Sequence, residues 1–398
     1  MAELFDRTKI KGLELKNRLV RSATNEEMAD RDGFPTERLF ALYERLAKGG
    51  VGLIITGLAA VSVDGRASPR MNCIYSDDHI EKHRKLTDHV HSHGANIAMQ
   101  IAHAGRQTTK RLIGEQPIAP SPVKDKANFT TPREMTEGDI ERVIEDFAQG
   151  ARRAKEAGYD AVQLHCAHGY LISQFLCPYT NRRRDRWGGS VENRMRFLAE
   201  ICRRTRKLVG DAYPILVKMN AYDMMKGGLT LDEATVQARM MEEMGIDGIE
   251  VSCGIAEDGI SSLRGDIPIK ALIDDLGMFR KQPVMRFIMR RFGSKIIKTH
   301  PFYEEYNLNA ARVIKSNLKI PVFAVGGNVD PVKMRGIVER GDADYVSLCR
   351  ALIIEPNFPR QMEEGRTEPS RCIHCNLCLF YMQLGPLRCY RGKRIKRD

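Results

Sequence analysis

Three polar rings stand close together in the stretch His165-Cys-Ala-His168-Gly-Tyr170. They follow an apolar run at residues 161–164, which predicts a short buried strand. The rings would then emerge together at the carboxyl end of that strand, where parallel α/β enzymes place their active sites. Two imidazoles can donate hydrogen bonds to one oxygen atom, and a phenol beside them can deliver a proton. The alternatives are a metal site or two histidines that only cap a strand.

Eight apolar runs, most of them followed by a helical pattern, must position these rings. They lie at residues 18–23, 52–60, 96–102, 161–166, 214–220, 248–253, 321–326 and 345–350. Several are hydrophobic throughout, which is typical of strands buried on both faces. Thr136 three residues before Asp139, and Thr230 three before Glu233, indicate capped helix starts. Eight alternating units predict a (β/α)8 TIM barrel over residues 1–365, and no Gly-x-Gly-x-x-Gly motif favours a Rossmann fold instead.

Two segments interrupt the alternation. Residues 255–307 form an insertion after the sixth predicted strand, and residues 278–298 within it carry seven Lys or Arg and no acid among apolar residues. This pattern predicts a basic amphipathic helix, which could serve as a lid, a clamp for an anionic substrate or a membrane-surface patch. We expect a lid, because loops after barrel strands cover the active face. The second segment is a short Cys-rich tail at residues 366–398.

The tail places four cysteines, Cys372, Cys375, Cys378 and Cys389, within eighteen residues. Four thiols with this C-x2-C-x2-C-x10-C spacing can converge on one metal centre. Tetrahedral zinc suits such a set, and so does an iron–sulfur cluster. The remaining alternative is that the thiols pack the tail against the barrel without a metal.

Charge and composition restrict the class of protein. The chain has 398 residues, ten cysteines and a formal charge of +12. No recognition helix or aromatic RNA motif accompanies the basic residues, so we expect no nucleic-acid partner. There is no 18-residue apolar run and no signal-peptide pattern at the start, so we expect no integral membrane segment and a cytoplasmic protein with reduced thiols.

Residues 165–190 closely resemble the signature of the old yellow enzyme family, the flavin-dependent ene reductases, and the resemblance extends over nearly the whole chain. It implies FMN as cofactor and NAD(P)H as reductant. His165 and His168 would hold the carbonyl oxygen of an enone or enoyl substrate, and Tyr170 would protonate its α-carbon. The flavin-binding residues that the resemblance implies are Ser22, Ala23, Thr24, Gly57, Leu58, Gln100, Lys218, Gly326, Gly327, Cys349 and Arg350.

Four of these positions have a chemical reason to contact a flavin. The Gln100 amide offers donors and an acceptor to the pyrimidine edge of the ring. A Lys218 cation near the N1–C2 carbonyl region would stabilise the negative charge of a reduced flavin. The Gly326-Gly327 pair after the seventh strand resembles a phosphate site, where backbone N–H groups need a close approach.

The cysteine tail resembles one branch of the family, which includes 2,4-dienoyl-CoA reductase and trimethylamine dehydrogenase and carries a 4Fe–4S cluster just after the barrel. That branch has three residues between its second and third cysteines, whereas this chain has two. A second hypothesis is therefore a flavin dehydrogenase or demethylase that passes electrons through the cysteine cluster to a partner protein. A third is a basic nucleic-acid-binding protein with an inactive barrel. We expect the ene reductase, as a homo-oligomer.

Overall fold

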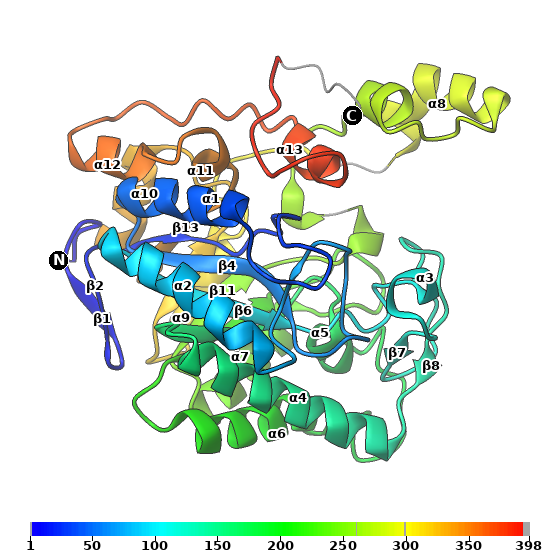
Figure 1. Ribbon diagram of the computed structural model, residues 1–398, viewed down its shortest axis with the longest axis horizontal. Coiled ribbons are helices and arrows are strands. Elements are labelled where there is room, and N and C mark those ends of the chain that lie inside the picture. Colours follow the sequence, from blue (N-terminus) through cyan, green and yellow to red (C-terminus); the bar gives the residue numbers. More distant parts are fainter. Residues whose placement is uncertain (1, 260, 298–299, 393–398) are drawn as a thin grey trace.

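The computed structural model describes residues 2–259, 261–297 and 300–392. Eight parallel strands form a closed barrel with helices around it (Figure 1). The barrel closes because its first strand pairs with both the second and the last. The strands are β3 (Leu19–Arg21), β4 (Leu53–Ala60), β6 (Asn96–Ala102), β9 (Ala161–Cys166), β10 (Ile215–Asn220), β11 (Gly248–Ser252), β12 (Val322–Val325) and β13 (Tyr345–Leu348). Their ends lie within two residues of the predicted runs, which confirms the (β/α)8 barrel.

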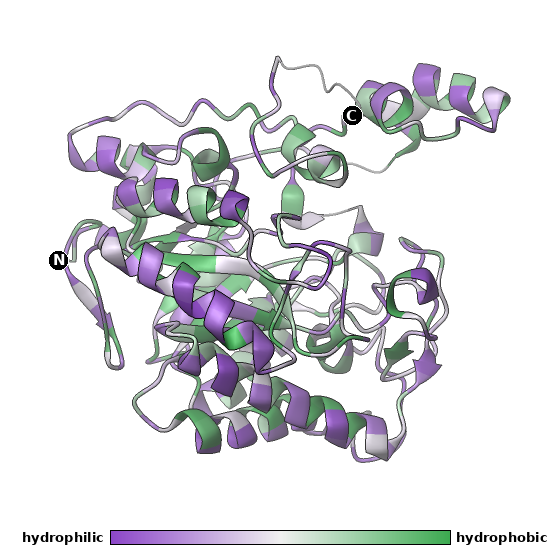
Figure 2. Ribbon diagram, in the orientation of Figure 1, coloured by the Kyte–Doolittle hydropathy of each residue, from purple (hydrophilic) through white to green (hydrophobic). Residues whose placement is uncertain are grey.

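The outer layer consists of amphipathic helices that follow the strands. They are α1 (Glu37–Lys48), α2 (Asp78–Ser92), α4 (Glu137–Glu156), α6 (Val191–Val209), α7 (Leu231–Glu243), α9 (Leu308–Lys315), α10 (Pro331–Glu339), α11 (Arg350–Ile354) and α12 (Phe358–Glu363). Helix α4 begins at the predicted capping box, in which Oγ1 of Thr136 accepts from the Asp139 amide and the Asp139 carboxylate accepts from the Thr136 amide. Figure 2 shows hydrophobic colour concentrated on the barrel strands and polar colour on the outer helices.

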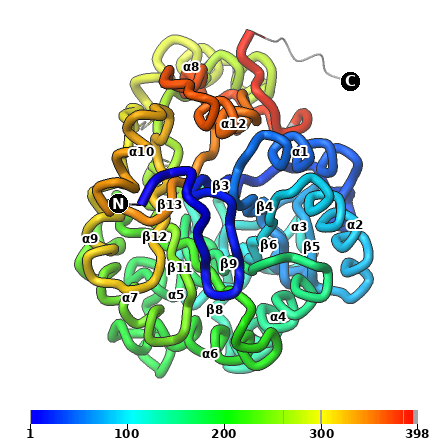
Figure 3. The backbone as a smooth tube through the Cα atoms, turned by 90° about the vertical axis from the view of Figure 1, so that its left-hand side faces the viewer, coloured from blue at the N-terminus to red at the C-terminus, as the bar shows by residue number. Residues whose placement is uncertain are grey.

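A hairpin closes the amino-terminal end of the barrel. Its strands β1 (Thr8–Ile10) and β2 (Leu13–Leu15) are antiparallel, and Figure 3 shows the hairpin lying across the barrel opening. Its apolar residues join a buried cluster with inward-facing side chains such as Leu216 and Phe323. This apolar cluster fills the amino-terminal half of the barrel interior. The polar residues of the same strands lie at the carboxyl end.

Short strands and helices lie in the loops at the carboxyl end of the barrel. They are β5 (Asn72–Cys73), which extends β4, the pair β7 (Ile118–Ala119) and β8 (Arg133–Glu134), α3 (Lys110–Ile113), and α5 (Leu171–Leu176) directly after β9. Among the described helices, none is long and apolar enough to cross a membrane.

The insertion after the sixth barrel strand contains the predicted basic helix, α8 (Pro283–Ile296). Before it lie short helical turns at Ala256–Asp258, Ser261–Leu263 and Ala271–Asp275, while residues 260 and 298–299 lie outside the described residues. Figures 1 and 3 both place α8 at the periphery of the molecule. Gly293 of α8 packs closely on Ile269, but Phe287 is 69% exposed.

The Cys-rich tail returns over the barrel after α12. It holds α13 (Leu377–Phe380) and a turn at Tyr381–Gln383, and residues 393–398 lie outside the described part. The Asn376 amide group donates to the carbonyls of Leu263 and Asp266, so the tail is fastened to the start of the insertion. The tail thereby comes to lie beside the carboxyl ends of the barrel strands.

Candidate active site

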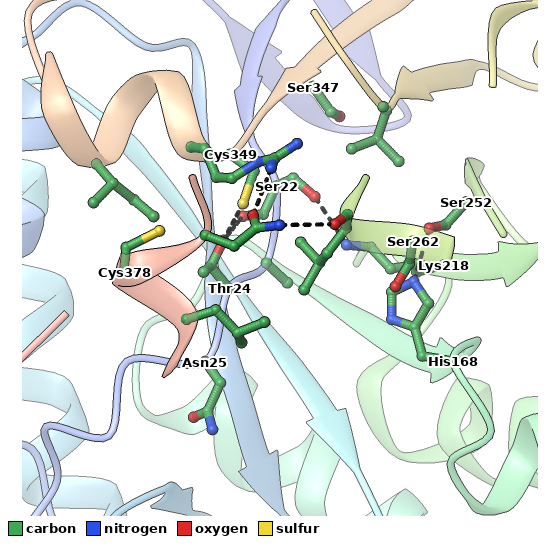
Figure 4. A pocket seen from close by; sticks show the side chains of 18 of the residues that line it. Ser22, Thr24, Asn25, His168, Lys218, Ser252, Ser262, Ser347, Cys349 and Cys378 are labelled. Carbon is green, nitrogen blue, oxygen red and sulfur yellow. Dashed lines mark hydrogen bonds between the residues drawn. The ribbon is translucent and has the colours of Figure 1, made fainter. Parts of the chain in front are cut away.

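A cavity of about 270 Å³ lies at the carboxyl end of the barrel strands. Loops after the strands, both ends of the insertion and the tail contribute to its wall. Most of the residues predicted to bind the flavin or to act on a substrate line it: Ser22, Ala23, Thr24, Leu58, Gln100, His165, His168, Tyr170, Lys218, Gly326, Gly327, Cys349 and Arg350. Figure 4 shows Ser22, Thr24 and Cys349 close to one another, and Lys218 beside His168.

The three predicted rings meet at one wall of this cavity. The His165 ring lies 5.1 Å from that of His168 and 4.7 Å from that of Tyr170, measured between centroids. His165 stands near the end of β9, and the chain then turns sharply because His168 and Gly169 adopt positive φ angles of 61° and 79°. Tyr170 follows as the residue before α5. The local turn therefore brings three side chains from within six consecutive positions onto one surface.

Burial sets the protonation states of these rings. It lowers the pKa of His168 to about 3 and holds the pKa of His165 well below its ordinary value, and the positive charge of Lys218 contributes to both shifts. Burial also raises the pKa of Tyr170 to about 12. At neutral pH the imidazoles are therefore uncharged, each with one N–H to donate, and the phenol keeps its proton.

Each histidine ring is held differently. Nε2 of His168 lies 2.7 Å from the Ser252 hydroxyl, which fixes the orientation of this ring. Nδ1 of His165 is buried and has no hydrogen-bond partner among the described residues. Buried polar atoms are rarely left unpaired, so this nitrogen marks a position where a ligand or a water belongs.

A buried cation lies beside the predicted flavin contacts. Nζ of Lys218 donates to the Ser22 hydroxyl at 2.8 Å, and both residues line the cavity. Lys218 stands inside strand β10 and is 3% exposed, so it is not a surface lysine that reaches out to water. Gln100 of β6 lines the same cavity. The ammonium group and the amide are thus both available to a flavin ring.

The far end of the cavity is built by the glycine pair and the last strand. Gly326 and Gly327 have φ angles of 130° and 81°, and a Cβ on Gly326 would lie 2.7 Å from the Tyr306 ring. Only glycine fits both the conformation and the space here. Nη1 of Arg350 donates to Oδ1 of Asn376 at 2.6 Å, so the predicted phosphate-binding arginine also holds the tail in place.

Gly57 is the one predicted flavin contact that does not line the cavity. Its amide donates to the buried Glu26 carboxylate at 2.9 Å, which also receives hydrogen bonds from Arg21 and Tyr43. The pairing of β4 with β6 shifts register between Ile55 and Leu58, and Gly57 lies within this irregular stretch.

All four tail cysteines line one small void, and Cys378 lines the large cavity as well. No three of these thiols have their sulfur atoms within 4.8 Å of one another in the described part of the chain. A single tetrahedral zinc ion with Zn–S bonds of about 2.3 Å would hold its sulfurs closer together than that. The donor type and the shared void are compatible with a thiolate-bound metal.

Several cavity residues were not predicted. Ser252 and Ser347 occupy inward positions on β11 and β13, and the two-residue alternation of the predicted strands could have identified them. Asn328, directly after the glycine pair, donates to the carbonyls of Ala324 and Ser347 and ties the last two strands together. His374 reaches the cavity only because the tail folds back, which no local pattern signals.

The closed barrel with a polar cavity at its carboxyl end has the architecture of a TIM-barrel enzyme. The sequence model described as the NADH:flavin oxidoreductase / NADH oxidase family matches residues 3–258 and 268–369. The chain belongs to this family, that of the old yellow enzymes, and membership implies FMN and NAD(P)H.

Relatives with known names agree with this placement. The chain is 38% identical over 379 residues to the NADH oxidase of Thermoanaerobacter brockii, a match that covers 94% of this chain and 53% of that protein. It is 36% identical over 357 residues to an NADPH dehydrogenase of Geobacillus sp. strain WCH70, covering 89% and 92%. The chain thus spans about half the length of the NADH oxidase, and also of the metal reductase of Desulforamulus reducens, to which it is 33% identical.

Solved structures share the architecture. A 2-naphthoyl-CoA reductase complex superposes with a TM-score of 0.84 at 26% identity, covering 98% of this chain and 57% of that one. Histamine dehydrogenase from Rhizobium sp. 4-9 superposes with a TM-score of 0.80 at 25% identity, covering 98% and 52%. An old yellow enzyme homologue from Zymomonas mobilis, at 24% identity and a TM-score of 0.73, shares the fold over 94% and 96% of the two chains.

Proposed function

We propose that this chain reduces the C=C bond of an α,β-unsaturated carbonyl compound, with FMN as cofactor and NAD(P)H as reductant. The observation that carries the proposal is the meeting of two neutral imidazoles and a protonated phenol at one wall of the cavity. Two N–H donors suit a carbonyl oxygen that gains negative charge, and the phenol suits a carbon that needs a proton.

FMN bound in this cavity would, after reduction by NAD(P)H, supply the hydride for the β-carbon of the substrate. His165 and His168 donate hydrogen bonds to the carbonyl oxygen and become more favourable partners as that oxygen takes on enolate charge. One such donor contributes about 3–4 kcal/mol to a transition state. Tyr170 gives its proton to the α-carbon, so a hydride and a proton together saturate the double bond.

The residues present fit FMN. Lys218 and Gln100 offer a cation and an amide at the cavity wall, and the Gly326-Gly327 pair leaves space where side chains would collide with Tyr303 or Tyr306. Arg350 lines the same end and provides charge for a phosphate. These residues would hold the ring and the phosphate at opposite ends.

Purified protein is expected to be yellow and to contain one non-covalent FMN per chain. The measurement is an absorption spectrum, followed by heat release and chromatographic identification of the cofactor. Release of FAD, or a colourless protein that takes up no flavin on reconstitution, would refute the proposal. An NAD(P)H-dependent loss of the flavin band, restored by an enone, would support the reaction.

A second candidate function is an oxidative one, a flavin dehydrogenase or demethylase that passes electrons through a cluster to a partner protein. The observation in its favour is that Cys378 lines both the large cavity and the void shared by the four cysteines. The likeness to histamine dehydrogenase supports this candidate, and the likeness to 2-naphthoyl-CoA reductase supports the reductive one.

Anaerobically purified protein is expected to contain iron and acid-labile sulfide bound by Cys372, Cys375, Cys378 and Cys389. The Cys378→Ala variant should lose most of that iron, whereas Cys202→Ala, which removes a buried thiol of α6, should keep it. Elemental analysis with thiol alkylation of the folded protein decides the matter. Less than about half an equivalent of iron and zinc together, with all four thiols free, would exclude the site.

The lid, the cellular location and the oligomeric state of the enzyme are proposals as well. We propose that the two ends of the insertion act as the lid, since Ala256 and Tyr306 line the cavity and no described residue of α8 does. A cytoplasmic location is supported by the ten cysteines, none of which forms a disulfide in the described part of the chain. A homo-oligomer is proposed as the working form, with size-exclusion chromatography and light scattering as its test.

A further inference from the structure

A continuous chain of buried polar groups runs under the cavity across four neighbouring strands, β6, β9, β10 and β11. Nε2 of Gln100 donates to Oε1 of Gln163 at 2.7 Å, and Nε2 of Gln163 donates to Oε2 of Glu250 at 3.0 Å. The same Oε2 lies 3.1 Å from Nζ of Lys218, which donates in turn to Ser22. Gln100, Lys218 and Ser22 line the cavity, whereas Gln163 and Glu250 lie behind its wall.

The Glu250 carboxylate determines which way the two glutamine amides point. A carboxylate accepts hydrogen bonds and cannot donate them, so Gln163 must present its NH₂ group to Glu250. The carbonyl of Gln163 then faces Gln100, which must donate its own NH₂ group. Oε1 of Gln100 is left without a hydrogen bond from any described residue, and it is available as an acceptor for an N–H of a ligand in the cavity.

The same carboxylate also pairs with the cation. The side chains of Lys218 and Glu250 are 4% and 0% exposed, and Oε1 of Glu250 has no hydrogen-bond partner among the described residues. A buried ion pair rarely adds net stability relative to apolar side chains of similar size. Its position directly beneath a cavity residue therefore points to a role in binding or electrostatics rather than in holding the barrel together.

We propose that Glu250 is a positioning residue that orients the Gln100 amide toward the flavin and moderates the positive charge that Lys218 presents to it. This inference rests on the proposed function, because it assumes that FMN occupies the cavity. The negative charge of Glu250 opposes the charge gained on reduction, so it lowers the reduction potential of the flavin and makes the reduced cofactor a stronger hydride donor. The carboxylate does so without touching the flavin or the substrate.

The Glu250→Gln variant tests the electrostatic part, since it removes the charge and keeps the shape. Its flavin midpoint potential, measured by photoreduction against a reference dye, is expected to become more positive. A tenfold change in the reduction equilibrium corresponds to about 30 mV for a two-electron couple. Glu257→Gln is the matched control, because Glu257 forms another buried ion pair, with Arg106, and does not line the cavity. An unchanged or more negative potential in Glu250→Gln, or an equal shift in the control, would overturn the assignment.

The Gln163→Met variant tests the orienting part and leaves the Lys218–Glu250 pair in place. Its FMN dissociation constant is expected to rise by up to about tenfold, the range of one lost hydrogen bond, while the potential stays near that of the wild type. Affinity equal to that of the wild type would show that the amide chain does not orient Gln100. This measurement also decides the orienting part if Glu250→Gln fails to fold.

Failure of the proposed function can be distinguished from failure of the role proposed for Glu250. If the wild-type protein takes up no FMN, the proposed function is wrong. If it binds FMN and both variants match it in potential and affinity, only the role of Glu250 is wrong.

Discussion

The His165→Ala and His168→Ala variants are each expected to slow enone reduction by about 10²–10³-fold, because each removes one N–H donor from the carbonyl oxygen. Both imidazoles are neutral at pH 7, since burial lowers the pKa of His168 to about 3 and holds the pKa of His165 well below its ordinary value. The losses should not multiply in the double variant, because the two donors act on the same oxygen. The measurement is the rate at which an enone reoxidises the reduced enzyme in single-turnover experiments.

Binding of a phenolic ligand provides an independent check on the same two residues. Its affinity, followed by titration of the flavin spectrum, should fall in both variants while the FMN content stays unchanged. His91→Ala is a suitable control, because His91 lies on the outer helix α2 and contacts Asp160 at the surface. Wild-type affinity and turnover in the two active-site variants would mean that these histidines do not hold the substrate oxygen.

The Tyr170→Phe variant is expected to slow the oxidative half-reaction by about 10²–10⁴-fold, the usual contribution of a general acid. The reductive half-reaction with NAD(P)H should keep its rate, because only the second step takes a proton from this phenol. Phenylalanine preserves the ring that packs 4.7 Å from His165, so the wall of the cavity stays in place. Stopped-flow measurement of each half-reaction separates the two rates, and equal slowing of both would remove Tyr170 from the role of acid.

The acid role also carries a pH dependence. Burial raises the pKa of Tyr170 to about 12 and lowers the pKa of His168 to about 3, so neither group changes its charge between about pH 5 and 10. The oxidative half-reaction should therefore be flat across that range and should fall only as the pH rises toward the pKa of the phenol. A rate that follows an ionisation near neutral pH would assign the proton to another group.

Much of the barrel and of the catalytic wall could be predicted from the sequence, because both depend on neighbours along the chain. Strands buried on both faces require unbroken apolar runs, and all eight such runs became barrel strands within two residues of their predicted ends. His165, His168 and Tyr170 lie within six positions, so one strand end and one turn suffice to gather them. The start of α4 followed in the same way from the contact between Thr136 and Asp139.

Only the tertiary structure decided what lies beneath and over that wall. Glu250 reaches Lys218 because these residues are register partners in the pairing of β10 with β11. Gln163 reaches Gln100 because they are partners in the pairing of β6 with β9. No local sequence pattern specifies how deep a side chain lies inside a closed barrel. Gly57 lies in the irregular part of the β4–β6 pairing and does not line the cavity. The tail joined the cavity because Asn376 binds Arg350 and the start of the insertion. Apolar periodicity reports which face of an element is buried, whereas contacts between distant segments depend on how the closed barrel packs, and that is settled only when the whole chain folds.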